Sequence, residues 1–337
     1  MMTDNEFRAR RRQIYLDRES TEATYTHIFD GIENVKKNLL ENYYVQEGKF
    51  SAYSSIAYDL LTIFRLQYTA GEDLTVLAES LTAIVEAYER YAEELLELSD
   101  DDYYPPFRMV DMIDIYVDYI NLLSAAILLH REDLIPRVFG LIKETDYDGI
   151  DLVIEELLIP FIPNRPDIDE WLWDKPYGRL LEAKYEDTPE DRAKGIKKYV
   201  KTWYPSMKGE AHFWGAHKKI TPEFSPYYGY WAMCAAAFSY LYDIDDSSYR
   251  DEIVYPKDLA DYARSKPRRT AAEAAKLVPK ELRRCEGGKP CPETGLWFTP
   301  AKTDSQQIFR QGDTMPILQT DYGTTIWYWV QGQVRHM

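Results

Sequence analysis

Three groups of side chains have types and spacings that could do chemistry. The first is the pair Cys285 and Cys291, which are separated by five residues that include Gly287-Gly288. This spacing is compatible with a disulfide-closed loop, with two metal ligands or with two free thiols. A structural zinc site normally needs four ligands, commonly in closer pairs, and only His336 follows in the tail. The three states stay open, although we expect no metal here.

The second group is His212 and His217, which flank Phe213-Trp214. On a helix, a separation of four would place two rings on one face, whereas a separation of five does not. The pattern is not that of an HExxH zinc site, so a structural role, such as a bond to a backbone carbonyl, is favoured over metal binding. The chain has five histidines, which leaves few candidates for general acid–base catalysis near neutral pH.

The third group is the acidic turn that contains Asp243, Asp245 and Asp246, followed by Ser247 and Ser248. Two of these carboxylates could act as a catalytic pair. The sequence contains no G-x-S-x-G, no glycine-rich phosphate loop and no H-x-E with C-x-x-C. The commoner use of such a turn is to end one helix and cap the next. We favour that use, keep an interface role for Asp245 and Asp246 as the alternative, and expect no catalytic residue.

This acidic turn ends the most apolar stretch of the chain. Tyr227 to Tyr242 contains no charged side chain, and its large residues would cover every side of a helix. Ser225 and Pro226 have the types favoured at an N-cap and a first helical position. A helix that is apolar all round must be surrounded by protein or lipid, and this one is short for a membrane span. The sequence predicts a central helix here, in whose core Cys234 is a small apolar residue, and a second helix from about Pro256.

The N-terminal half has the periodicity of a helical array. Apolar residues recur at spacings of three and four, and they predict the following helices: Asn5 to about Asn42 with a break near Ser20, Phe50 to Tyr68, Leu74 to Leu98, Met109 to His130, Leu134 to Lys143, and Ile150 to Leu158.

The predicted helix at 74–98 has an acidic side opposite its apolar stripe. That side carries Glu86, Glu89, Glu93, Glu94 and Glu97, and it continues into Asp100-Asp101-Asp102-Tyr103-Tyr104. Clustered carboxylates repel one another unless a positive group faces them. The simpler interpretation is a solvated face. The sharper one is a binding surface for a cationic partner, with Tyr103 and Tyr104 as the amphipathic anchors that interfaces favour.

The proline-dense stretch 160–166 suggests a domain boundary. We expect a helical domain over 1–160, a second helical domain over 161–265 and a C-terminal tail over 266–337. In the second domain, Thr188-Pro189 should open a helix that continues through Trp203. Thr270 and Glu273 form a further capping box. The tail should hold a short helix at 305–310 and two strands, at 296–299 and 324–330. The predicted fold class is mainly α: a two-domain helical array or bundle with a small β-containing C-terminal appendage.

The charge of the chain limits its partners. The 337 residues carry a formal charge of −17, with a pI near 4.8. This charge argues against direct binding to nucleic acid or to an anionic membrane, and it is compatible either with a basic protein partner or with solubility alone. No apolar run reaches the length of a transmembrane helix, no signal-peptide pattern is present, and the three cysteines fit a reducing compartment. We therefore expect a cytoplasmic location.

Several rare residues occur in an order that resembles a known family. These are Trp203-Tyr204, Trp214, His217, Tyr228-Gly229-Tyr230-Trp231, Asp245-Asp246-Ser247-Ser248 and Tyr255-Pro256-Lys257-Asp258-Leu259. In this order they resemble the C-terminal domain of PoNi-type immunity proteins of bacterial polymorphic toxin and type VI secretion systems. The N-terminal half resembles the helical domain that precedes it, by domain order, and the tail is similar to tails on other toxin-immunity proteins. Cys234 departs from the family, where we expect a glutamate.

The resemblance implies an immunity protein that blocks a cognate antibacterial toxin, a nuclease, by stoichiometric occlusion, without enzymatic activity or a cofactor. Two alternatives come from other classes: a metal-dependent hydrolase that uses the acidic turn with His212 and His217, and a helical scaffold protein. A homodimer is a further open alternative. The residues that we expect to contact the toxin are Glu93, Glu97, Asp100, Asp101, Asp102, Tyr103, Tyr104, Asp245 and Asp246.

Overall fold

The computed structural model describes residues 3–40, 46–98, 105–269, 273, 284–292, 294–299, 302, 305–318 and 325–329. The chain divides into two compact units, Met1–Leu277 and Val278–Met337. The first unit is helical and the second contains a small sheet, so the predicted fold class, mainly α with a small β-containing C-terminal region, is confirmed. Within the described ranges, no helix is long and apolar enough to cross a membrane.

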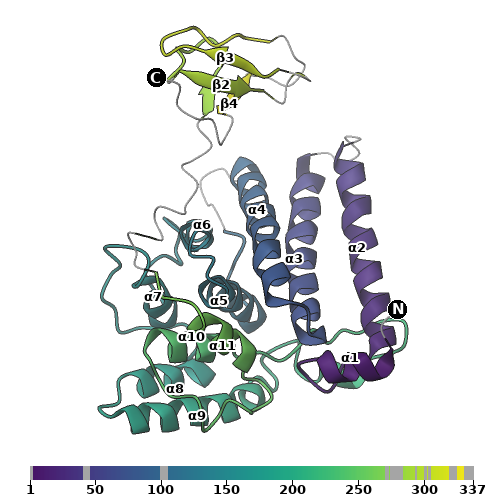
Figure 1. The fold of residues 1–337 in the computed structure, drawn as a ribbon, viewed down its shortest axis with the longest axis vertical. Helices are drawn as coiled ribbons and strands as arrows, with labels where there is room; N and C mark the ends of the chain where they lie inside the picture. The colour runs from purple at the N-terminus through teal and green to yellow at the C-terminus, as the bar shows by residue number, and fades with distance from the viewer. Residues whose placement is uncertain are drawn as a thin grey trace. The chain divides into compact units, whose positions relative to one another are not determined.

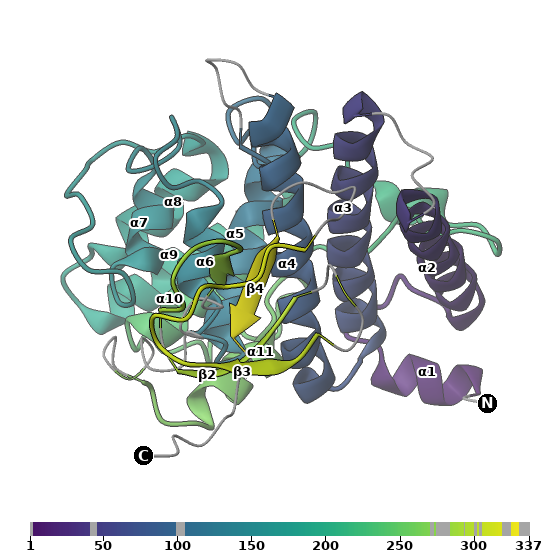
Figure 2. The same ribbon diagram turned by 90° about the horizontal axis from the view of Figure 1, so that it is seen from above.

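Four helices form the N-terminal part of the first unit. They are α1 (Asp4–Arg10), α2 (Arg18–Leu40), α3 (Gln46–Ala70) and α4 (Leu74–Leu98). The long helices α2, α3 and α4 lie side by side (Figure 1), and α1 lies near the ends of α2 and α3 (Figure 2). The helix predicted at 74–98 is confirmed at both ends.

The break in the first predicted helix lies before Ser20, over residues 11–17. Asp17 caps α2: its carboxylate accepts hydrogen bonds from the Ser20 backbone N–H over 2.9 Å and from the Ser20 hydroxyl over 2.8 Å. Ser20 is thus part of the first turn of α2, and the predicted break near Ser20 is confirmed, a few residues before it.

The remaining helices of the first unit surround a buried centre. They are α5 (Ile113–Leu128), α6 (Ile135–Gly140), α7 (Leu152–Leu158), α8 (Asp174–Lys184), α9 (Pro189–Ser206), the short 3-10 helix η1 (Ala216–Lys219), α10 (Met233–Leu241) and α11 (Lys257–Arg264). Thr188 caps α9 as predicted, because its hydroxyl accepts from the Asp191 N–H over 3.1 Å.

The apolar helix α10 begins later than predicted. Residues 225–232 are not helical, and the prediction that Ser225 and Pro226 open the helix was wrong. Gly229 lies at φ +108°, and a Cβ atom there would come within 2.2 Å of the Thr69 hydroxyl and of the Trp231 indole nitrogen. This segment forms hydrogen bonds with α3 and with residues 11–24, and those bonds override the local helix signals.

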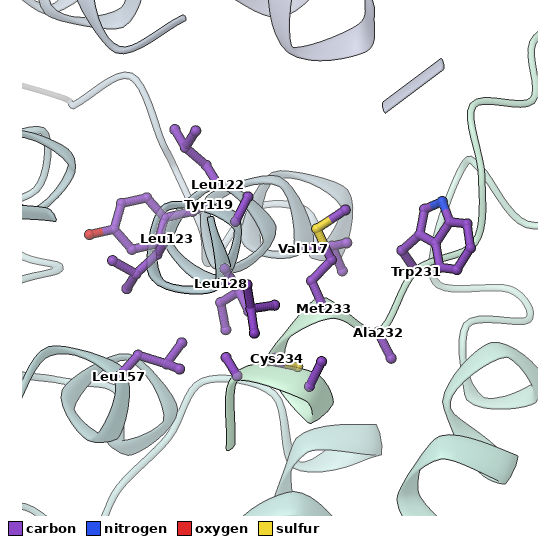
Figure 3. Packing of buried hydrophobic residues seen from close by; sticks show 14 of the residues in the cluster. Val117, Tyr119, Leu122, Leu123, Leu128, Leu157, Trp231, Ala232, Met233 and Cys234 are labelled. Carbon is purple, nitrogen blue, oxygen red and sulfur yellow. The ribbon is translucent and has the colours of Figure 1, made fainter. Parts of the chain in front are cut away.

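The core of the first unit lies between α5, α7 and α10. Helix α5 is buried along almost its whole length, and every residue of α10 is buried. Figure 3 shows side chains from the three helices meeting there, among them Val117, Leu157 and Cys234. Both α10 and α11 pack against α5, so contacts cross residue 160, where we placed a domain boundary. That boundary stays a prediction.

The second unit contains a four-stranded antiparallel sheet with the strand order β1-β4-β2-β3. The strands are β1 (Arg284–Glu286), β2 (Gly295–Phe298), β3 (Gln307–Phe309) and β4 (Ile326–Trp329). The strands predicted at 296–299 and 324–330 are confirmed as β2 and β4. The predicted helix at 305–310 was wrong: β3 lies there, with Leu296 of β2 opposite Ile308.

The core of this sheet consists of Cys285, Cys291, Trp297, Phe309, Met315 and Trp327. Strand β1 was not predicted, because three residues with one apolar member give no periodic signal. The helix predicted after Thr270 lies outside the described residues, with the exception of Glu273, which is helical.

Candidate functional site: an acidic helix face and an aromatic cluster

The predicted acidic binding surface is described only in part. Glu93 and Glu97 are exposed on α4, as expected. Asp100, Asp101, Asp102, Tyr103 and Tyr104 lie outside the described residues.

Arginines of the same unit neutralise some of the carboxylates on α4. Arg90 bonds to Glu93 over 2.7 Å and also pairs with Glu94. Glu94 is 1% exposed, so its place on the solvated side was predicted wrongly; Arg90 lies over its carboxylate. Arg137 bonds both oxygens of Glu89, at 2.8 and 2.5 Å. The side chains of Glu86, Glu93 and Glu97 are exposed on this side.

The acidic turn separates its carboxylates. Asp245 is exposed and accepts bonds from Ser247, at 3.1 Å from its N–H and 2.6 Å from its hydroxyl, and these bonds lower the pKa of Asp245. Asp243 pairs with Arg268 at 3.1 Å. Asp245 therefore closes a local turn and does not cap the next helix, since α11 begins at Lys257 with Pro256 at its N-cap. The carboxylates do not converge on one site.

Asp246 is buried within this turn, at 3% exposure. Its carboxylate accepts from Arg250 at 3.1 Å, Arg264 at 2.6 Å and the Tyr255 hydroxyl at 2.9 Å. All of these partners belong to the chain itself. Asp246 therefore holds the turn against α11, and its carboxylate is not exposed to a partner.

Several residues of the family motif meet in one aromatic cluster, which consists of Tyr15, Tyr204, Trp214, His217, Tyr227 and Tyr230. Its members contact one another through their rings. The centroids of Tyr204 and Tyr230 are 4.3 Å apart, those of Tyr15 and His217 are 4.4 Å apart, and Trp214 stacks on Tyr204 at 5.9 Å. Tyr227 and Tyr230 are buried, whereas the other four members are partly exposed. The cluster is thus a surface with a buried base.

His217 is fixed within the cluster by Tyr230. The His217 backbone N–H donates to the Tyr230 hydroxyl oxygen at 3.1 Å, and the ring Nδ1 lies 2.8 Å from the same oxygen. Burial, and after it the charge of Lys218, lowers the pKa of His217. His212 is highly exposed and lies 3.5 Å from Asp114. The two histidines therefore have separate partners.

The other motif residues are internal. Trp203 is 1% exposed and stacks on Phe213 at 5.9 Å. The Trp231 indole N–H donates to the Thr69 hydroxyl at 2.8 Å, which ties the motif to α3. Gly229 lies close to Thr69 and Trp231, whereas Tyr255 donates to Asp246 and packs on Tyr249, away from the cluster contacts.

The segment between α1 and α2 completes the cluster, and sequence reasoning missed it. Gln13 is 1% exposed; its amide nitrogen donates to the carbonyls of Tyr230 at 2.7 Å and Ile253 at 2.6 Å, and its oxygen accepts from the Tyr230 N–H at 2.9 Å. Arg12 pairs with Asp258, to which Tyr68 also donates at 2.6 Å. No local pattern marks these contacts, because they join residues about 200 positions apart.

The cysteines are free and buried. Cys234 lies 3.1 Å from the Tyr199 hydroxyl, and burial raises the pKa of its thiol to about 12. Burial also raises the pKa values of Cys285 and Cys291. Among the described residues, no three His, Cys, Asp or Glu side chains gather in a group that could hold a metal ion.

A groove of about 370 Å³ lies between α1, α2 and α3. Phe7, Tyr25 and Leu66 form its apolar lining. Its charged groups are engaged within the chain: Arg10 pairs with Glu72 at 2.6 Å, and Glu22 pairs with Arg18 at 2.8 Å. The groove is thus an apolar depression whose charged rim residues form ion pairs within the chain.

Comparisons with known proteins agree with the sequence motif. Residues 149–259 match the family model described as PoNe immunity proteins (PoNi), C-terminal. A search of curated proteins found no match. Among solved structures, the fold is similar to that of protein PA2201 from Pseudomonas aeruginosa, with a TM-score of 0.61 and 19% identity over 76% of this chain and 91% of that chain.

The matched range runs from the segment before α7 into α11, and it contains five of the six residues of the aromatic cluster together with the turn at Asp245 and Asp246. Tyr15 and Gln13 come from outside it. The resemblance seen in the sequence is thereby confirmed: over residues 149–259 this chain is similar to the C-terminal region of PoNi-type immunity proteins.

Proposed function

We propose that this protein binds a cognate antibacterial toxin, a nuclease, and blocks it by stoichiometric occlusion. The observation that carries the proposal is the family match over residues 149–259. Toxins of the polymorphic type delivered by type VI secretion are the class that the sequence resemblance implies. The protein acts by occupying its partner, in the cytoplasm of the cell that it protects.

The charge of the chain supports a nuclease as the partner. Enzymes that degrade nucleic acid present cationic surfaces to the phosphates of their substrate. A chain with a formal charge of −17 is drawn to such a surface, and it raises the rate of encounter. Glu86, Glu93 and Glu97 give α4 an exposed row of carboxylates that suits this role.

The placement of the titratable groups supports a function without catalysis. The ring of His130 is buried between the Glu132 carboxylate at 3.1 Å and the Ala263 carbonyl at 2.9 Å. Asp151 is buried and accepts from the N–H groups of Ile154 and Leu172. Asp246 is buried among its own partners, as described above. These groups are engaged inside the fold, whereas catalysis needs such groups to reach a substrate.

Co-expression with the gene of a candidate toxin tests the proposal. We expect rescue of growth, together with co-purification of the two proteins as a complex of fixed stoichiometry. A matched culture that expresses a chain shortened to residues 1–148 should not be rescued. The proposal is wrong if the full chain neither rescues growth nor co-purifies with the toxin.

A further inference from the structure

A second charged surface, opposite in sign to the chain as a whole, lies in the segment 197–219. This segment contains six lysines and one glutamate, although acidic residues exceed basic residues in the full sequence by 57 to 40. The lysines are Lys197, Lys198, Lys201, Lys208, Lys218 and Lys219. Among them, only Lys201 has an ion pair with a described residue, Glu252, at 3.5 Å. The segment is thus positively charged, in contrast to the chain as a whole, and most of its lysines form no ion pair with a described residue.

Two of these lysines lie beside a member of the aromatic cluster, and two more share a helix face with another member. Lys197, Lys201 and Tyr204 follow one another at spacings of four and three on α9, so they share a helix face. Trp214 stacks on Tyr204, and the ammonium groups of Lys208 and Lys218 lie 5.7 and 5.6 Å from the centre of its ring. Two cations, one from the turn after α9 and one from η1, therefore lie near one partly exposed indole.

Apolar surface adjoins this arrangement on the side of the N-terminal segment. Tyr15 is 36% exposed and contacts His217, and Ile14 beside it is 66% exposed. Partly exposed aromatic side chains with a charged rim are the composition that protein interfaces favour. A surface of this kind, with cations in excess, is complementary to a chain segment that combines acidic and apolar residues.

We propose that the surface formed by Lys197, Lys201, Tyr204, Lys208, Trp214 and Lys218, the lysine–tryptophan patch, binds an acidic segment of a protein partner. An acidic side chain of that segment lies beside Lys208 and Lys218, and an apolar side chain packs against Trp214 and Tyr204. This inference deepens the proposed function and rests on it, because the partner is the toxin. Contacts at α4 and at the patch, of opposite sign, then fix the orientation in which the toxin docks.

The charge of the whole chain favours an acidic protein segment over nucleic acid as the ligand of the patch. A duplex carries one negative charge per about 1.7 Å of its axis. At a net charge of −17, the rest of this protein repels such a polyanion at every distance within the screening length. A short acidic segment on a basic toxin meets no such repulsion, since the surrounding surface of the toxin is attracted to the acidic parts of this chain.

The test uses the full chain and a matched pair of charge-reversal variants. Lys208→Glu with Lys218→Glu changes the patch, and Lys36→Glu with Lys143→Glu makes the same change in net charge on exposed lysines elsewhere. Binding is measured by calorimetry to the purified toxin domain, and by fluorescence anisotropy to a labelled peptide of alternating glutamate and leucine. A peptide with glutamine in place of glutamate and a 20-base-pair DNA duplex are the reference ligands.

We expect the patch variant to bind both the toxin and the acidic peptide at least about tenfold more weakly, and the control variant to change by less than about threefold. The glutamine peptide and the duplex should bind at least about tenfold more weakly than the acidic peptide. Trp214→Ala should weaken the acidic peptide as well, because it removes the apolar part of the surface.

Three results overturn the inference: equal binding by the patch variant and the control, binding of the duplex in preference to the peptide, or equal binding of both peptides. If the wild-type chain does not bind the toxin, the proposed function fails, and the peptide measurements still decide the patch. Lys208→Gln with Lys218→Gln is the second variant if the reversal lowers the melting temperature. This neutral variant should lose less affinity than the charge-reversal variant but more than the control variant.

Discussion

The Nδ1 atom of His217 lies 2.8 Å from the hydroxyl oxygen of Tyr230, which also accepts the backbone N–H of His217 at 3.1 Å. Because this oxygen already accepts from the backbone, its own hydrogen can be donated to Nδ1, which places the ring proton of the neutral imidazole on Nε2. The bonds between these two motif residues thus hold η1 against the buried base of the aromatic cluster. The partly exposed residues Tyr204 and Trp214 lie on this base.

Removing the Tyr230 hydroxyl should therefore destabilise the fold. Tyr230→Phe deletes both hydrogen bonds and leaves a backbone N–H without its partner, so we expect a loss of about 1–3 kcal/mol in the free energy of unfolding, measured in urea. Tyr15→Phe is the matched control on the same cluster, and it should change stability by less than about 0.5 kcal/mol. Equal losses in the two variants would show that the His217–Tyr230 bonds do not stabilise the fold.

The pair Arg65 and Asp118 gives a pH-dependent term in stability. Asp118 on α5 is buried, and burial raises its pKa to about 6, against the opposing effect of Arg65 on α3. The folded pKa therefore exceeds that of the unfolded chain, so the folded state binds more protons between about pH 4 and pH 6. The stability that Asp118 contributes is largest below about pH 4 and is lost as the pH rises towards 6.

The measurement is a set of urea titrations of the wild type and of Asp118→Asn from pH 4 to pH 7.5. As the pH rises from about 4 to 6, the wild type should lose roughly 2–3 kcal/mol of unfolding free energy relative to Asp118→Asn. Above this window the difference between the two proteins should stay constant. A difference that is constant throughout, or one that moves in favour of the wild type, would contradict the assignment.

The two aspartates of the acidic turn should behave differently. Asp246→Asn removes a buried carboxylate that Arg264 and Arg250 share, although Arg250 keeps Asp261, so we expect a loss of about 3 kcal/mol. Asp245→Asn changes an exposed turn residue and should cost about 1 kcal/mol or less. Thermal unfolding followed by circular dichroism measures both changes. A larger effect of Asp245 than of Asp246 would be inconsistent with the structure.

Hydrophobic periodicity correctly predicted the helices that are determined by residues close together in the sequence. The heptad-like stripe on residues 74–98 gave both ends of α4, and Thr188 gave the start of α9, since caps and stripes depend on neighbours along the chain. It failed at residues 225–232, where the backbone groups bond to Gln13, Thr24 and Thr69, which are distant in sequence. Propensity cannot anticipate bonds to such partners. The same reason explains why β3 was predicted as a helix.

The motif residues were found from the sequence, but their arrangement was not. The sequence does not distinguish the burial of Trp203, Trp214 and Trp231. In the structure, Trp203 and Trp231 are buried, whereas Trp214 is partly exposed. The neutralisation of Glu89 by Arg137 was also hidden, because it needs the packing of α6 against α4. Charge patterning along one helix identifies a face, whereas only the fold shows which charges on it are already paired.

Reversing the exposed carboxylates of α4 should slow the encounter with the toxin. Replacing Glu86, Glu93 and Glu97 with lysine should lower the association rate about tenfold at low salt, by an amount that shrinks as salt is added. The matched control replaces Glu182, Glu186 and Glu190, which are also exposed. Stopped-flow measurements give both rates. If the two variants associate equally fast, net charge alone drives the encounter and α4 is not the contact surface.

Extending the change to Asp100, Asp101 and Asp102 should deepen the effect if the predicted surface continues past α4. We expect the six-fold variant to associate more slowly than the triple variant while it retains the same helix content. An association rate equal to that of the triple variant would remove these three aspartates from the predicted toxin-binding residues.

Titration of the purified chain against a fixed amount of the active toxin tests the central claim most directly. If the protein acts by occupying its partner, residual nuclease activity falls in a straight line and reaches zero at a fixed, near-equimolar ratio, with both proteins intact afterwards. Loss of toxin activity at far lower ratios, growing with incubation time, would show that the chain acts catalytically on its partner and would contradict this account.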